Sequence, residues 1–237
     1  MVGRRSMSEL KVLSGGAVQK GLEDVAWVFQ EQTGHEVMLT FATAPVLRST
    51  VEKGEAPFDI VIAPVPLAEN FTQGGLVGAG TSAVIGSVKA GVVVRAGVHV
   101  PDISTGGALK KEILASQSLV FNEGSSGIYV EEMLEKLGVA KEAKAKTTRL
   151  PNAEAVMMHL AHSKTAHEIG FGQITAIRLY AGRGVKIVGP LPPEIGNTTI
   201  YAAAVLARTR VPELAKEFIR FLIAPSAQEI LRATGVE

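Results

Sequence analysis

The chain of 237 residues contains no cysteine, which excludes disulfides, thiolate metal ligands and a cysteine nucleophile and leaves the redox compartment open. It also lacks an excess of either charge: 24 basic residues stand against 23 acidic ones, for a net charge of +1. That balance gives no reason to expect a nucleic acid or an anionic membrane as partner. No apolar run reaches the ~20 residues of a membrane span, so we expect no membrane insertion.

A signal peptide is also missing from the sequence as written. Met1–Glu9 carries Arg4 and Arg5, but no apolar stretch separates them from the first predicted strand. We therefore expect a cytoplasmic protein, or a periplasmic one if a signal peptide has been removed. Because Met7 would serve as a natural start, residues 1–7 are expected to be disordered or vector-derived.

Motifs of catalysis and of cofactor binding are absent too. There is no nucleophile elbow, phosphate-binding loop, dinucleotide fingerprint or zinc-protease motif, and we expect no cofactor. His159 and His162 lie three residues apart on a predicted helix, with His167 beyond them, a spacing that can place two imidazoles on one metal ion. No carboxylate or cysteine joins them in a known ligand motif, so a solvated helix face is the favoured interpretation and no metal site is predicted.

A positioned acid–base pair needs no local motif, so catalysis stays open. Glu123, Glu131 and Glu132 lie near one predicted loop and are the candidates. Exposed helical glutamate is the favoured interpretation of the last two.

The sequence does contain three junctions at which a strand meets a small-residue loop and then a helix, at Leu10–Val18, Phe41–Val46 and Phe121–Val130. Backbone N–H groups at a helix start favour an anionic or strongly accepting group, and small side chains let a ligand approach them. We expect these loops to meet at one cleft.

The order of elements indicates an α/β fold. A predicted strand at Glu36–Phe41 and a short, largely apolar one at Phe58–Ala63 alternate with helices that end at Gly34 and Gly54, which implies a parallel sheet with right-handed crossovers. Farther along, Asn152 is expected to cap a helix that continues to about His162. Near the end, Ser226 and Glu229 are expected to form a capping box.

Three segments resemble the molybdate-binding group of type II periplasmic binding proteins, the substrate-binding subunits of ABC importers. They are Leu22–Gly34, Phe58–Pro64 and the tail Val211–Gly235, with its Pro-Glu-x-Ala-Lys-x-Phe and Phe-Leu-x-x-Pro-x-Ala-Gln-x-Ile-Leu pattern. The resemblance implies a two-lobed α/β fold, each lobe a mostly parallel sheet flanked by helices, with two hinge crossovers. Lobe one would be residues 8–83 plus 201–237, and lobe two 84–200.

The site residues implied by the resemblance depart from the family's pattern. Ala17 stands where molybdate binders usually have a serine, Thr43 and Ala44 stand where they have paired serines, and Gln173 replaces a tyrosine. Ser125 and Ser126 add hydroxyls to a loop that is usually apolar. A desolvated tetrahedral oxyanion needs several donors, so these changes argue against molybdate. The residues expected to bind a ligand are Ser14, Gly15, Gly16, Ala17, Thr43, Ala44, Arg48, Ser125, Ser126, Tyr129, Arg149, Asn152 and Gln173.

The resulting hypothesis is reversible binding of a small anionic solute in the cleft between the lobes by hinge closure. The solute would be a molybdate-type oxyanion or, preferably, an organic carboxylate. One alternative is a metal-free cytoplasmic enzyme on the same fold, an isomerase, tautomerase or decarboxylase of a small carboxylate. Another is a cytoplasmic ligand sensor. An ABC permease would be a partner only of an exported protein.

Overall fold

The computed structural model describes residues 7–54 and 57–237, and the contacts within it divide the chain into two compact units. Unit 1 contains the residues up to Ser87 together with Ile200–Glu237, and unit 2 contains Val88–Thr199. Of the segment 1–7, expected to be disordered or vector-derived, residues 1–6 lie outside the described residues.

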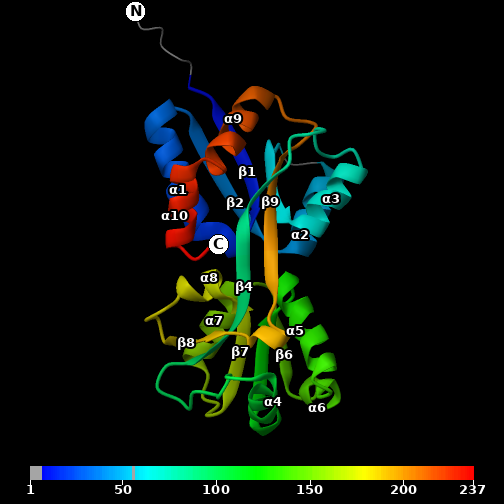
Figure 1. Ribbon diagram of the computed structural model, residues 1–237, viewed down its shortest axis with the longest axis vertical. Helices are drawn as coiled ribbons and strands as arrows, with labels where there is room; N and C mark the ends of the chain where they lie inside the picture. Colours follow the sequence, from blue (N-terminus) through cyan, green and yellow to red (C-terminus); the bar gives the residue numbers. More distant parts are fainter. Residues whose placement is uncertain (1–6, 55–56) are drawn as a thin grey trace, which may run out of the picture. The chain divides into compact units, whose positions relative to one another are not determined.

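Two strands belong to both units: β4 (Ala83–Arg95) and β9 (Thr198–Val205) (Figure 1). Through them the hydrogen-bonded strands of the described residues form one mixed nine-stranded sheet in the order β2-β1-β3-β9-β4-β7-β5-β6, with β8 paired to β4. This differs from the expected separate sheet in each lobe. The physical reason is that β4 and β9 continue past the unit boundary, so backbone pairing is not interrupted there.

Unit 1 is built on three parallel strands, β1 (Glu9–Gly15), β2 (Glu36–Ala42) and β3 (Ile60–Pro64), and β9 pairs antiparallel with β3. All of β3 is buried, as its continuous apolar run predicted. The helices of this unit are α1 (Gln19–Thr33), α2 (Ala44–Lys53), α3 (Val65–Gln73), α9 (Pro212–Leu222) and α10 (Pro225–Ala233).

The apolar face of α1 packs against the C-terminal helices. Leu22, Val25 and Phe29 are buried at helical spacing. The Phe29 ring lies edge-on to Phe218 and Phe221, with centroids 5.0 and 5.3 Å apart. This contact attaches the end of the chain to its beginning.

Unit 2 has a parallel core of β7 (Glu168–Gln173), β5 (Ser118–Asn122) and β6 (Thr147–Leu150), in that order. β4 runs antiparallel to β7 and to β8 (Val185–Pro190). The helices of this unit are α4 (Gly106–Ala115), α5 (Ser125–Lys136), α6 (Ala140–Lys144), α7 (Ala153–His162) and α8 (Ile174–Arg178).

The sheet of unit 2 is covered on both faces. Val92 and Phe121 belong to one apolar cluster, while their neighbours Val93 and Val120 belong to another. This alternation is the period of a strand, and it explains why these strands are apolar at nearly every position.

Several predicted helix ends are confirmed. Gly34 and Gly54 close α1 and α2 in the left-handed conformation, and Asn152 caps α7. The predicted capping box was wrong, because α10 begins at Pro225 and Ser226 is already inside the helix. β3 ends at Pro64, and α3 begins directly after it with Pro66 in its first turn, a position that proline tolerates.

Candidate functional site

The carboxyl ends of the three parallel strands in unit 2 lie at one edge of the sheet. Asn122 at the end of β5 is level with Leu150 at the end of β6, and the N–H of Glu123 donates to the Leu150 carbonyl at 3.0 Å. Each strand is followed by a helix, α5, α7 or α8, so helix N-termini gather along the same edge. Unpaired N–H groups at helix starts attract anionic groups. We call this the unit 2 edge.

The start of α5 is held by Asn122, which the sequence reading did not single out. Its Oδ1 accepts from the Gly124 N–H at 2.7 Å, and its Nδ2 donates to Ser126 Oγ at 3.2 Å. A Cβ on Gly127 would lie 1.6 Å from the Asn122 carbonyl oxygen, so the helix packs directly on the strand end. Ser126 is therefore buried and bonded within the loop, whereas Ser125, one residue earlier, is half-buried.

Gln173 ends β7 and carries an unsatisfied polar atom. The residue is only 5% exposed; its Nε2 donates to Thr199 Oγ1 at 3.0 Å, while its Oε1 has no hydrogen-bond partner in the part of the chain that is described. Thr199 Oγ1 in turn donates to Asn197 Oδ1 at 3.4 Å. A buried acceptor left without a donor is costly, so this oxygen is a candidate contact for a group from outside the described residues.

Three other predicted site residues of unit 2, Tyr129, Asn152 and Arg149, use their polar groups within the protein. The Tyr129 hydroxyl donates to the carbonyls of Ile195 (2.8 Å) and Gly196 (3.2 Å), and burial raises the pKa of this phenol. Asn152 Oδ1 accepts from the Ala155 N–H at 2.8 Å as the cap of α7.

Arg149, the third of these residues, lies on β6. Its Nη1 pairs with Glu131 at 2.9 Å, and its guanidinium lies over the Phe121 ring, 5.8 Å from the centroid. Glu131 is thereby the partner of an arginine, while Glu123 and Glu132 are exposed. Of the three acid–base candidates, Glu123 lies closest in sequence to the end of β5.

Unit 1 has a similar edge, where β1, β2 and β3 end. Ser14 is buried and its hydroxyl donates to the Gly15 carbonyl at 3.1 Å. A Cβ on Gly15 would lie 2.9 Å from the Tyr201 ring, so this glycine makes room for an aromatic side chain. Gly16 and Ala17 belong to a 3-10 turn, Gly16–Val18, that precedes α1, and a Cβ on Gly16 would meet no atom within 4 Å. Gly16 is the open position of this loop.

The second loop of unit 1 places Thr43 at the N-cap position of α2, although its side chain accepts no hydrogen bond from the helix. Ala44 is the first helical residue. Arg48 is exposed and pairs with Glu52, one turn farther along α2, at 3.5 Å. The contact of any of these residues with a solute stays a prediction.

The histidines of α7 do not form the pair that their spacing allowed. His159 Nε2 lies 3.1 Å from Glu168 Oε1, and His162 Nδ1 lies 2.8 Å from the Met158 carbonyl oxygen. His167 lies near other residues, described below.

Comparison with known proteins defines the class. The family model described as bacterial extracellular solute-binding protein matches residues 10–237, and the chain belongs to this family. In the part of the chain that is described, no helix has the length and apolar character of a membrane span.

Individual relatives match 96–100% of the chain at low identity. An aconitate isomerase of Pseudomonas sp. is 25% identical over 100% of this chain and 90% of its own sequence. A molybdate-binding protein of Azotobacter vinelandii is 24% identical over 96% of this chain and 89% of its own.

Among solved structures, the periplasmic molybdate-binding protein of Azotobacter vinelandii matches with a TM-score of 0.80 and 20% identity, covering 96% of this chain and 98% of its own. The sulfate-binding protein SubI of Mycobacterium tuberculosis matches with a TM-score of 0.78 and 15% identity, covering 97% of this chain and 86% of its own. The fold is therefore that of the molybdate-binding type of periplasmic binding protein.

Proposed function

We propose that the chain binds a small organic carboxylate and that the unit 2 edge provides part of the site. One observation carries the proposal: the helix N-termini of this edge lie beside Gln173, whose buried amide oxygen has no partner among the described residues. The helix starts supply donors for an anionic group, and Gln173 supplies a polar contact for a second group on the same solute.

The amide of Gln173 favours a solute with mixed polarity. As placed, it offers an acceptor, which suits a hydroxyl or a protonated acid group and not a bare oxyanion. The Thr199 hydroxyl can donate as well as accept, so a half-turn of the amide would present Nε2 instead. The site can thus adapt to either kind of group.

A thermal-shift panel of molybdate, tungstate, sulfate, phosphate and small carboxylates, including cis- and trans-aconitate, tests this proposal. A ligand that binds only the folded state raises the melting temperature by mass action. At a hundredfold excess over Kd, it increases the free energy of unfolding by about 2.7 kcal/mol. We expect a shift with one or more carboxylates. A shift with molybdate or tungstate alone would refute the carboxylate assignment.

Variants then locate the site. We expect Gln173→Leu and Ser125→Ala to weaken binding of the active carboxylate about tenfold each, the cost of one hydrogen bond to a charged or polar group. Ser49→Ala is the matched control, because Ser49 is exposed on α2. Equal affinity in wild type and in both edge variants would remove the unit 2 edge from the proposal.

Turnover of the solute is a second candidate function, favoured by the similarity to an aconitate isomerase over the whole chain. Moving a double bond requires a group that takes and returns a proton, and Glu123 is an exposed carboxylate next to the end of β5. The test is NMR of trans-aconitate incubated with the protein. Product formed by wild type and by Glu132→Gln but not by Glu123→Gln would support turnover with Glu123 as the proton-transfer group. If wild type leaves the substrate unchanged, turnover is refuted and binding is the only function proposed.

Hinge closure on the solute, implied by the resemblance, stays part of the proposal. So does an ABC permease as partner if the protein is exported. The rival role, a cytoplasmic sensor, would instead require a protein partner whose binding depends on the solute. Genes for a permease and an ATPase beside this one would favour transport, and a neighbouring regulator would favour sensing.

A further inference from the structure

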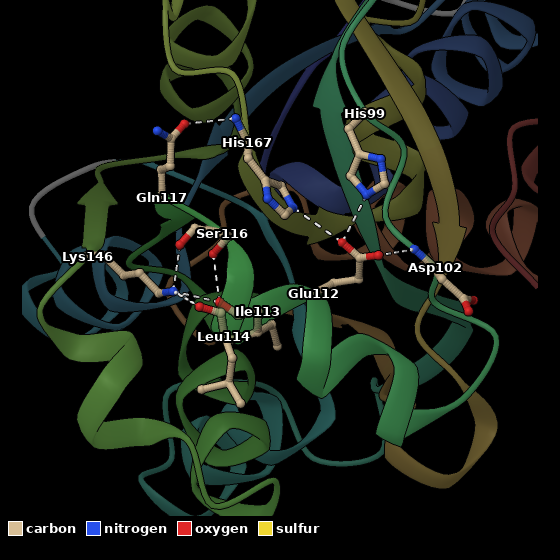
Figure 2. Close-up of polar contacts among 9 residues, drawn as sticks. All are labelled: His99, Asp102, Glu112, Ile113, Leu114, Ser116, Gln117, Lys146 and His167. Carbon is tan, nitrogen blue, oxygen red and sulfur yellow. Dashed lines mark hydrogen bonds and ion pairs between the residues drawn. The ribbon is translucent and has the colours of Figure 1, made fainter.

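Three side chains with metal-binding atoms converge in unit 2, away from its carboxyl edge. His99 lies in the segment after β4, Glu112 lies on α4, and His167 directly precedes β7 (Figure 2). Glu112 Oε2 is 3.0 Å from His99 Nε2 and 3.3 Å from His167 Nε2. One ligand atom from each residue lies within 4.8 Å of the other two.

The surrounding bonds hold these side chains in place. Glu112 Oε1 accepts from the Asp102 N–H at 3.2 Å, which leaves Oε2 for the two histidines. The backbone of His167 is fixed by Gln117, whose N–H donates to its carbonyl at 2.8 Å and whose Oε1 accepts from its N–H at 3.2 Å. The two imidazole rings lie edge to face, with centroids 5.1 Å apart.

The two histidines compete for a single carboxylate oxygen. His167 Nε2 is buried and forms no well-directed hydrogen bond with any described residue, despite its 3.3 Å approach to Glu112. A cation placed among the three atoms would be bound by the lone pairs of both imidazoles and by the carboxylate. It would satisfy this nitrogen, which the protein alone does not.

We propose that His99, Glu112 and His167 bind a divalent transition-metal cation of the Zn²⁺ class. Two imidazoles and one carboxylate are a donor set that Zn²⁺ accepts in proteins, and three protein ligands leave a fourth position for water. Tetrahedral Zn²⁺ with bonds of about 2.0–2.2 Å holds its ligand atoms about 3.3–3.5 Å apart. The two distances to Glu112 are already close to that separation, and the ligand atoms of the two histidines lie within 4.8 Å of each other.

The position of this site separates it from the proposed solute site. His167 stands before the first residue of β7, whereas Gln173 ends the same strand, so the cation and the solute would occupy opposite edges of the unit 2 sheet. The cation would join three segments that are distant in sequence. Its expected effect is stabilisation of unit 2, without a role in the chemistry of the solute.

Titration of the full chain with Zn²⁺, after treatment with a chelator and removal of any histidine tag, tests the proposal by calorimetry and thermal unfolding. We expect one Zn²⁺ per chain and a higher melting temperature. Bound Co²⁺, used as a probe, should show the visible spectrum of a four-coordinate ion with nitrogen and oxygen ligands.

The variants His99→Ala, His167→Ala and Glu112→Gln should each weaken Zn²⁺ binding at least tenfold. His162→Ala is the matched control, an exposed histidine on α7 that should leave binding unchanged. His99 has 55% of its side chain exposed, so His99→Ala tests the site with little risk to folding. No binding by wild type, or an equal loss in His162→Ala, would overturn the proposal.

Discussion

Lys146 stabilises the C-terminal end of α4, and replacing it should weaken unit 2 measurably. Its ammonium donates to three carbonyl oxygens, of Ile113 (2.7 Å), Leu114 (3.0 Å) and Ser116 (2.7 Å) (Figure 2). The last carbonyls of a helix have no partner within it and form the negative end of its dipole. Burial lowers the pKa of Lys146, so desolvation of the ammonium offsets part of this gain.

Hydrogen bonds to a charged group contribute about 1.5–3 kcal/mol each, and partial exposure together with desolvation reduces the sum of three. We therefore expect Lys146→Met to lower the free energy of unfolding by about 2–3 kcal/mol. For a chain of this size, 1 kcal/mol corresponds to about 2–4 °C, so the melting temperature should fall by about 4–12 °C.

Urea and thermal unfolding, followed by circular dichroism, measure this loss. Lys144→Met is the matched control, because Lys144 is exposed two residues earlier and should change stability by less than about 0.5 kcal/mol. If both variants unfold alike, the three carbonyl contacts do not contribute to stability and the reasoning is refuted.

Further predictions concern the packing of α4 and α5. Tyr129→Phe should lower the free energy of unfolding by about 1–2 kcal/mol, because the carbonyls that accept from its hydroxyl lose their donor. Differential scanning calorimetry measures this loss. Gly127→Ala should lower the free energy of unfolding by about 3 kcal/mol or more, since the new Cβ would overlap backbone atoms. Gly107→Ala is the control, because its new Cβ would have its nearest neighbour at 3.8 Å. A similar melting temperature for the two variants would contradict this prediction. Glu194 accepts from the Gly106 N–H at 2.6 Å at the start of α4, and this bond lowers its carboxyl pKa. Its charge thus stabilises the fold above about pH 4.5 and ceases to do so as the pH falls through the lower folded-state value. The stability difference between wild type and Glu194→Gln, measured from pH 7 downward, should therefore disappear in acid; a constant difference would contradict this.

Local signals in the sequence determined most of the elements. Asn152 was predictable as a cap because its side chain reaches only three residues ahead, and Gly34 because a left-handed residue closes the helix directly before it. β3 was predictable from its apolar run alone.

The use of polar groups at the candidate site could not be predicted in the same way. Tyr129 bonds to carbonyls 66 and 67 positions away, and Arg149 pairs with Glu131 across 18. No periodic pattern encodes such pairs, because the fold brings them together. A signal for Asn122 did exist: an asparagine at the end of a buried strand, two residues before a glycine, is typical of a side chain that bonds to its own loop.

The histidines show the same limit. Helical spacing drew attention to His159 and His162, yet the side chains that converge are His99 and His167, which come from segments before α4 and before β7. Spacing along a helix finds only ligands that share an element.

The two strands that belong to both units also bear on how the chain folds during synthesis. Unit 2 is one continuous stretch, complete when Thr199 has emerged, whereas unit 1 is interrupted after Ser87 and resumes only at Ile200. One edge of β3 pairs with β1, but its other edge pairs with β9, where Ile60 lies opposite Val205. That second edge stays without its hydrogen-bond partners until β9 has been synthesised. The ribosome therefore delivers a complete second unit while an apolar strand of the first still exposes one edge. During that interval the nascent chain is most open to mispairing and to chaperones.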